Sequence, residues 1–312
     1  VAVPAHRLWG AQTQRSIDNF PIGVARFAFG RPVVRAFGLV KQAAARANES
    51  LDLLPPPLAT AIATAAAEVA AGQHDREFPV DVFQTGSGTS SNMNANEVIA
   101  NLAAERMGGP VHPNDHVNLG QSSNDVVPTA IHVSVLLLWQ RELQPALQVL
   151  VASLARREAE LASVTKTGRT HLMDAMPLTF GQEISAWRSQ VVLAEARLSD
   201  AAARLAQLAQ GGTAVGTGIN CHVEFPLRFC AELSRLTSVR FGPASNYFAA
   251  LSSQATALEW SAQLRGLAVE LLKICNDLRW MNSGPLAGLA EIELPALQPG
   301  SSIMPGKVNP VI

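Results

Sequence analysis

The chain has 312 residues, of which 48% are hydrophobic and only 5% aromatic, and its formal net charge is −1. This charge excludes both the basic field that nucleic-acid binding requires and a polybasic membrane patch. A chain of this length buries a sizeable core and favours two domains over one. Because its apolar residues are mainly Ala, Leu and Val, we expect an all-α protein of close-packed helices.

The cysteines Cys221, Cys230 and Cys275 have spacings that fit neither a disulfide framework nor a zinc site, so we expect free thiols in a reducing compartment. The most apolar stretch, residues 133–139, is too short to span a bilayer. The first residues lack the layout of a signal peptide. The sequence therefore predicts a soluble, cytoplasmic protein, and we expect both ends of the chain to be cut.

Residues 1–120 are mixed in character and predict an N-terminal domain. Ala-rich helices are expected at residues 37–51 and 58–71, separated by three consecutive prolines. A polar loop is expected at residues 84–92, followed by a helix at residues 96–106. Residues 121–312 instead predict a central bundle of long helices.

Within this bundle, the leucines of residues 143–161 recur at helical spacing, and Pro145 predicts a kink. A second helix is expected at residues 177–210, where Val191, Leu198 and Leu205 lie a heptad apart and Ala194 and Ala201 share their face. A third is expected at residues 249–281. Small residues at the contacts favour close helix packing.

Two polar clusters stand where helices begin. Ser87, Gly88 and Thr89 precede the helix of residues 96–106, and the exposed amides of a helix start favour an anion. No Gly-Lys-Ser/Thr follows, so this is not a nucleotide P-loop. Ser122, Ser123 and Asn124 offer three more donors at a helix N-terminus. The alternative for both clusters is simple helix capping, a role that Asp125 would also serve.

Histidines mark two further segments. His171 follows Thr170 in an expected loop between bundle helices, where an imidazole suits proton transfer. The alternative is a structural histidine. The run His112, Pro113, Asn114 and Asp115 fits a turn as well as a functional site. The glycine-rich residues 211–218 follow a helix and lack a βαβ unit, which argues against a nucleotide site.

The run at residues 300–310, Gly-Ser-Ser-Ile-Met-Pro-Gly-Lys-Val-Asn-Pro, predicts a loop that ends in a fixed cation. Such a loop suits a mobile lid over an anion, or only a surface turn. Together, these neutral donors, one loop lysine, one histidine and one serine suit a small dicarboxylate. Such a substrate would lose a proton from the carbon next to one carboxylate and a leaving group from the neighbouring carbon. The intermediate is an aci-carboxylate, whose negative charge Lys307, Asn309 and backbone amides can stabilise.

In six ordered runs, at residues 8–16, 85–94, 112–125, 168–183, 211–220 and 300–310, the chain resembles the class II fumarases of the fumarase/aspartase superfamily. The resemblance implies the helical-bundle fold of that superfamily with a mixed, mainly helical N-terminal domain. It also implies reversible hydration of fumarate to (S)-malate without metal or cofactor. A homotetramer is implied as well, with each active site drawing loops from three subunits.

By this resemblance, Ser301 takes the C3 proton of malate and His171 handles the leaving hydroxyl through a water. The implied substrate contacts are Ser87, Gly88, Thr89, Ser122, Ser123, Asn124, Thr170, Ser302, Lys307 and Asn309. His112, Pro113, Asn114 and Asp115 match a secondary dicarboxylate site. We expect the Ser301 alkoxide to be stabilised by Lys307 and by backbone amides of its loop.

Two alternatives remain at this point. The first is aspartate ammonia-lyase, which belongs to the same superfamily but typically has glutamine in place of His171. Val311 and Ile312 slightly favour this alternative, because aspartases often have such residues there. The other alternative is an inactive, truncated oligomerisation module. In the family a glutamate seven residues beyond the loop lysine orients the histidine, and that position would be 314.

Overall fold

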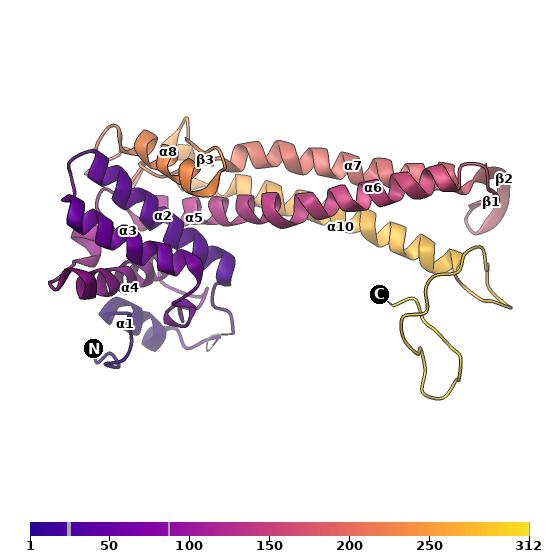
Figure 1. Cartoon of the computed structure of the whole chain (residues 1–312), viewed down its shortest axis with the longest axis horizontal. Coiled ribbons are helices and arrows are strands. Elements are labelled where there is room, and N and C mark those ends of the chain that lie inside the picture. The colour runs from indigo at the N-terminus through magenta and orange to yellow at the C-terminus, as the bar shows by residue number, and fades with distance from the viewer. Residues whose placement is uncertain (24–25, 87, 312) are drawn as a thin grey trace. The chain divides into compact units, whose positions relative to one another are not determined.

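The computed structural model describes residues 1–23, 26–86 and 88–311, and it is predominantly helical (Figure 1). The α-helices are α1 (Ala11–Asn19), α2 (Arg31–Ser50), α3 (Pro56–Ala71), α4 (Thr89–Met107), α5 (Ser123–Leu138), α6 (Gln144–Glu160), α7 (Phe180–Leu205), α8 (Phe225–Thr237), α9 (Tyr247–Ser252) and α10 (Ala255–Met281). The strands of the described residues are short: β1 (Thr165–Thr170), β2 (Met173–Thr179), β3 (Gln207–Leu208) and β4 (Gly242–Pro243). The predicted all-α class is confirmed.

The chain divides into two compact units. Unit 1 comprises Val1–Glu142 and Ala201–Glu259, and unit 2 comprises Leu143–Asp200 and Trp260–Ile312. The predicted division into an N-terminal domain of residues 1–120 and a bundle of residues 121–312 stays a prediction. None of the helices among the described residues is long and apolar enough to cross a membrane.

The core of unit 1 is built from alanine-rich faces of α2, α3 and α4. Ile62, Val69 and Ile99 are completely buried among alanines of these helices. Gly38 of α2 lies so close to α3 that an added Cβ atom would stand 2.5 Å from the backbone nitrogen of Ala70. The expected close approach of helices with small contact residues therefore holds here.

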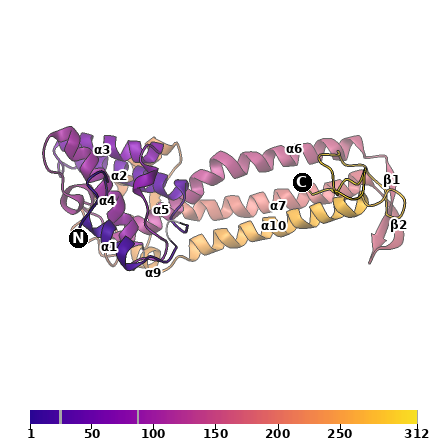
Figure 2. The same cartoon turned by 90° about the horizontal axis from the view of Figure 1, so that it is seen from below.

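In unit 2, α6 and the unit 2 parts of α7 and α10 lie side by side in both views (Figures 1 and 2). Arg188 of α7 donates a hydrogen bond from Nε to Glu158 of α6 at 2.6 Å, and Trp187 Nε1 donates to Asp277 of α10 at 3.3 Å. The predicted face of α7 is confirmed, because the side chains of Val191, Ala194, Leu198, Ala201 and Leu205 are all buried.

Residues 165–179 form an antiparallel hairpin rather than the loop expected around residues 168–171. Thr165 pairs with Thr179 and Thr170 with Met173, so the connection consists of two residues. Pro177 pairs with Thr167 within this hairpin, and for that reason α7 begins at Phe180 instead of at residue 177. The threonines of β1 lie on its exposed face, whereas Lys166 and Arg169 lie on the half-buried face.

Helix limits differ from the predictions where caps decide them. Helix α4 begins at Thr89, not in the region of residue 96, because Gly88 adopts a positive φ of 87° as its N-cap. Ser253 Oγ accepts a hydrogen bond from the Ala255 amide, which separates α9 from α10. A π-helical turn at Trp139–Leu143 connects α5 directly to α6, and Pro145 follows this turn by two residues. Both π-turns and prolines accompany bends in helices, and the predicted kink stays a prediction.

Candidate active site

The first group of predicted site residues lies at the N-terminus of α4 in unit 1. Ser87 lies outside the described residues. Gly88 has a left-handed backbone, and a Cβ atom there would stand 2.8 Å from the side chain of Val127 on α5, so both conformation and space favour glycine. Thr89 Oγ1 is 3.2 Å from Ser123 Oγ. The starts of α4 and α5 are therefore adjacent, and their hydroxyls meet.

The second group forms the N-terminus of α5. Ser122 is the N-cap, and its Oγ accepts a hydrogen bond from the Asn124 amide at 3.2 Å. Asp125 Oδ1 accepts from the Ser122 amide at 2.9 Å, which completes a capping box. The predicted capping role of Asp125 thus agrees with the geometry. Asn124 Nδ2 donates to the carbonyl of Ala214 at 2.7 Å, so one donor of this side chain is occupied within the chain.

Asp125 also explains the glycine-rich run at residues 211–218. Its Oδ2 accepts hydrogen bonds from the amides of Gly211 and Thr213, both at 3.0 Å. Burial raises the pKa of Asp125 to about 6, while the three backbone N–H donors and Lys41 act in the opposite direction. The run therefore binds an internal carboxylate, which attaches this loop to the start of α5.

A buried lysine that the sequence reasoning missed lies behind this helix start. Lys41 of α2 is completely buried, and its Nζ donates hydrogen bonds to Asn118 Oδ1 at 2.8 Å and to Gln121 Oε1 at 3.0 Å. The signal was present in the sequence, because the chain has only four lysines and this one falls on the same helical face as Phe37 and Ala44.

His112, Pro113, Asn114 and Asp115 begin a π-helical turn, Pro113–Val117, in unit 1. His112 Nδ1 accepts a hydrogen bond from the Asp115 amide at 3.1 Å, and the His112 amide donates to His116 Nδ1 at 3.0 Å. The His112 and Asp115 side chains are 54% and 76% exposed. The segment forms an exposed turn, as its sequence allowed, and its role as a secondary dicarboxylate site stays a prediction.

The hairpin of unit 2 carries Thr170 and His171. The two turn residues, His171 and Leu172, have φ values of 50° and 64°, the left-handed conformations that a two-residue hairpin requires. Such turns ordinarily contain Asn or Gly, because other side chains are strained there. The strain is compatible with a functional reason for a histidine at this tip, and the side chain is exposed in the single chain.

The predicted lid is a closed loop in unit 2. The Gly300 amide donates to the carbonyl of Lys307 at 2.7 Å, and Asn309 Nδ2 donates to the carbonyl of Gly300 at 3.0 Å. Inside this loop, Ser301 Oγ accepts hydrogen bonds from the amides of Ile303 at 3.3 Å and Met304 at 3.2 Å. The side chains of Ser302 and Lys307 are exposed. The serine oxygen therefore already faces two amide donors.

A cluster of four charged side chains joins the hairpin to the segment that precedes this loop. Lys166 of β1 contacts Glu183 of α7 at 2.5 Å and Glu291 at 3.3 Å, and Arg169 of β1 contacts Glu291 at 2.8 Å. Burial acts to raise the pKa of Glu291, but hydrogen bonds from Arg169 and Lys166 outweigh it and lower this pKa. The cluster holds the strand that leads to His171 against the segment that leads to Ser301.

We expect Glu291→Gln to loosen this connection, because Arg169 loses its carboxylate partner. A double-mutant cycle with Arg169→Met should give a coupling energy of about 1–3 kcal/mol in urea unfolding. The exposed pair Arg228 and Glu224 is the control, with an expected coupling energy below about 1 kcal/mol. Equal coupling energies for the two pairs would refute a special role for the buried cluster.

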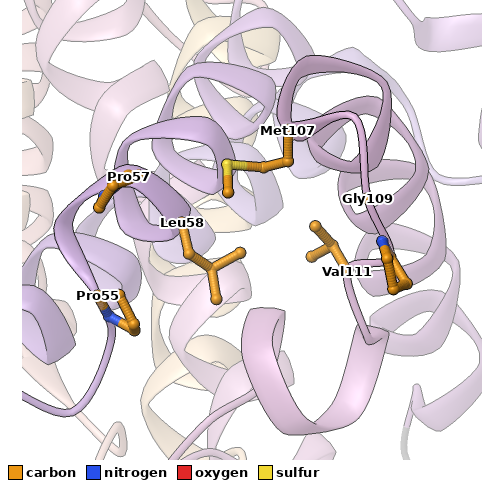
Figure 3. Close-up of a pocket in the computed structure, with 7 residues that line it drawn as sticks. Pro55, Pro57, Leu58, Met107, Gly109 and Val111 are labelled. Carbon is orange, nitrogen blue, oxygen red and sulfur yellow. The ribbon is translucent and has the colours of Figure 1, made fainter.

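A pocket of about 300 Å³ lies in unit 1, lined by Pro55, Pro57, Leu58, Met107, Gly109, Pro110 and Val111 (Figure 3). Its walls are formed mainly by apolar side chains, and none of the lining residues belongs to the predicted site. An apolar hollow does not suit a dicarboxylate. Among the described residues, no group of three or more His, Cys, Asp or Glu side chains lies close enough to hold a metal ion.

Known proteins resemble the chain throughout its length. The family described as "Lyase" matches residues 1–312. A fumarate hydratase class II from Xylella fastidiosa is 61% identical over 310 residues, which are 99% of this chain and 65% of that protein. The protein named fumarate hydratase class II 2 from Pseudomonas aeruginosa is 56% identical over 312 residues, covering 100% of this chain and 68% of its own length.

Solved structures agree. A recombinant class II fumarase from Schistosoma mansoni has a TM-score of 0.97 and 41% identity, with coverage of 99% of this chain and 69% of that one. A fumarate lyase:delta crystallin from Brucella melitensis bound to cobalt has a TM-score of 0.91 and 45% identity, with coverage of 99% and 68%. The chain thus spans about two thirds of the length of these proteins, and it belongs to the lyase family and, within it, to the class II fumarases.

Proposed function

We propose that this protein is a fumarate hydratase, which catalyses the reversible addition of water to fumarate to give (S)-malate. The observation that carries the proposal is the environment of Ser301, whose Oγ accepts hydrogen bonds from the Ile303 and Met304 amides. Backbone donors aimed at a serine oxygen favour its alkoxide, and an alkoxide is strong enough to remove a proton next to a carboxylate. The names of the relatives support the same reaction.

In the proposed elimination from malate, a serine alkoxide is the base. The Ser301 alkoxide takes the C3 proton, and the electron pair of the broken C–H bond moves into the neighbouring carboxylate to form the aci-carboxylate. That intermediate then expels the C2 hydroxyl, which leaves as water after it receives a proton from His171 through a bridging water. Lys307, Asn309 and loop amides meet the negative charge on the carboxylate oxygens, so the proposed chemistry requires no metal or cofactor.

The substrate contacts are proposed residue by residue. The proposed partners of the two carboxylates, which three copies of the chain would contribute to each site, are Gly88, Thr89, Ser122, Ser123, Asn124, Thr170, Ser302, Lys307 and Asn309. Hydroxyls and amides at the starts of α4 and α5 suit a dianion, because the N-terminus of a helix favours negative charge. Ser87 has the same proposed role.

A homotetramer is part of the proposal. In unit 2, Val149 of α6, Leu193 of α7, and Val269 and Leu272 of α10 expose between 51% and 68% of their surfaces. Exposed apolar side chains on successive helices support burial against further copies of the chain. We also propose a cytoplasmic location, which the free thiols of Cys221, Cys230 and Cys275 support.

The direct test measures the absorbance of fumarate formed from malate, aspartate and argininosuccinate in parallel. We expect fumarate from malate, with rates for the other two substrates lower by about a thousandfold or more, because the proposed site protonates a hydroxyl leaving group. Faster release from aspartate would identify an ammonia-lyase instead. No release from any of the three would refute the proposed activity.

A further inference from the structure

Lys41 occupies an unusual environment for a lysine. It lies in the middle of α2, where Val40, Ala43 and Ala44 are also completely buried. An ammonium group in such surroundings has lost its water, which is costly unless polar partners replace it. A fully buried lysine in a helix of this kind therefore calls for a reason other than packing.

The partners of Lys41 belong to one short turn. Asn118 and Gln121, which accept the two hydrogen bonds of the Lys41 ammonium group, lie between the π-helical turn Pro113–Val117 and α5. Asn118 Nδ2 in turn donates to the backbone carbonyl of Gln121 at 3.2 Å, and Gln121 Nε2 donates to that of Val117 at 3.1 Å. One buried nitrogen thus organises the turn of residues 117–121 from inside.

Further side chains of unit 1 complete this network. Asn48 Nδ2 of α2 donates to the backbone carbonyl of Leu119 at 3.0 Å, and Asn92 Nδ2 of α4 donates to Asn118 Oδ1 at 3.3 Å. The turn ends at Gln121, and the next residues along the chain are Ser122, Ser123 and Asn124. Any displacement of the turn therefore displaces the start of α5.

The charges around Lys41 fall into one pair. Burial lowers the pKa of Lys41 to about 7, and the Asp125 carboxylate acts in the opposite direction. Asn118 and Gln121 are neutral amides, so Asp125 of α5 is the charged group that acts on the ammonium from the elements packed against it. Lys41 consequently loses its positive charge as the pH rises through about 7.

We propose that Lys41 is a positioning residue, whose buried ammonium group fixes the turn of residues 117–121 and thereby the start of α5 for the binding of a dicarboxylate. One part of this proposal, the binding of a dicarboxylate by Ser122, Ser123 and Asn124, rests on the proposed function. The positional part stands on hydrogen bonds within unit 1 alone. The two parts are therefore open to separate tests.

The first test needs no substrate. In Lys41→Met, amide hydrogen exchange within residues 119–124 should be about tenfold faster, because the turn loses its charged donor. Exchange in α7 should stay as in the wild type. Lys273→Met is the matched control, since Lys273 is half-exposed and pairs with Asp277 on the surface of α10. Unchanged exchange in residues 119–124 would overturn the proposal, whatever the protein catalyses.

The second test uses steady-state hydration of fumarate. At pH 6, Lys41→Met should raise KM about tenfold while kcat changes less than about threefold, because the substrate-binding residues shift and the acid–base groups stay in place. The KM of the wild type should rise about fivefold between pH 6 and 8.5 as Lys41 loses its charge, whereas the KM of Lys41→Met should lack this component. If the KM values of the wild type and Lys41→Met changed with pH in the same way, or if Lys41→Met lowered only kcat, the positioning role would be contradicted.

If Lys41→Met does not fold, Lys41→Arg gives the answer, because it keeps the charge but cannot place one nitrogen between both amide oxygens. Faster exchange in residues 119–124 and a higher KM would support the proposal, and wild-type values would overturn it. A wild-type protein that does not hydrate fumarate would refute the proposed function, while the exchange experiment would still decide the role of Lys41.

Discussion

Ser301→Ala is expected to lower kcat for malate by a factor of about 10²–10⁴, the range in which a positioned general base contributes to proton transfer. In the structure, the Ser301 oxygen accepts hydrogen bonds from the backbone amides of Ile303 and Met304. Alanine removes the proton acceptor, and both amides lose their hydrogen-bond partner. The loop should stay closed, because the hydrogen bonds of Gly300 that close it are made with the Lys307 carbonyl and the Asn309 side chain. The loss should therefore appear in kcat much more than in KM.

The matched control is Ser283→Ala. Ser283 Oγ also accepts a backbone amide, that of Leu289 at 3.0 Å, in the same unit, but it is not part of the predicted site. We expect kcat to stay within about threefold for this variant and stability to fall by about 1 kcal/mol. Near-normal turnover by Ser301→Ala, measured as fumarate absorbance from malate, would show that another group removes the proton.

Asp125→Ala is expected to cost about 3–5 kcal/mol of unfolding free energy, the range seen when one partner of a buried ionic network is removed. Its carboxylate is completely buried and accepts hydrogen bonds from the amides of Ser122, Gly211 and Thr213. Alanine leaves these three donors unsatisfied and leaves Lys41 without its countercharge. The glycine-rich loop of residues 211–218 should detach from α5 as a result.

Urea unfolding followed by circular dichroism measures this effect, and Asp115→Ala is the control. Asp115 is 76% exposed, and its carboxylate makes only a surface contact with His112, so its loss should cost less than about 1 kcal/mol. If Asp125→Ala lost no more stability than Asp115→Ala, the buried network would not support the fold as described.

The fold class and the main helical faces followed from periodicity. On α7 the heptad-spaced Val191, Leu198 and Leu205 are all completely buried, because apolar residues at this spacing form one stripe of the helix that packs against the core. The hairpin of residues 165–179 did not follow from the same reasoning. Its residues are polar and its turn uses His171 and Leu172, so neither alternating hydrophobicity nor an Asn-Gly signal marks it.

At the candidate site, the sequence identified the residues at helix starts but not the groups that hold them. Capping was the alternative that the sequence offered for Ser122 and Asp125, and both residues take part in a capping box. The partners of Lys41 and Glu291 could not be predicted, because they lie 77 and 122 residues away along the chain. Local patterns report on local hydrogen bonds, whereas buried charge networks depend on which distant segments the fold brings together.

Hydration of fumarate in D₂O, followed by proton NMR, tests the central claim most directly. If Ser301 and His171 act as proposed, the protein should form (S)-malate with a single deuterium at C3, in one diastereomer, and Ser301→Ala should form it about 10²–10⁴-fold more slowly. Absence of malate from the wild-type reaction, or equal rates for the two proteins, would contradict the proposal.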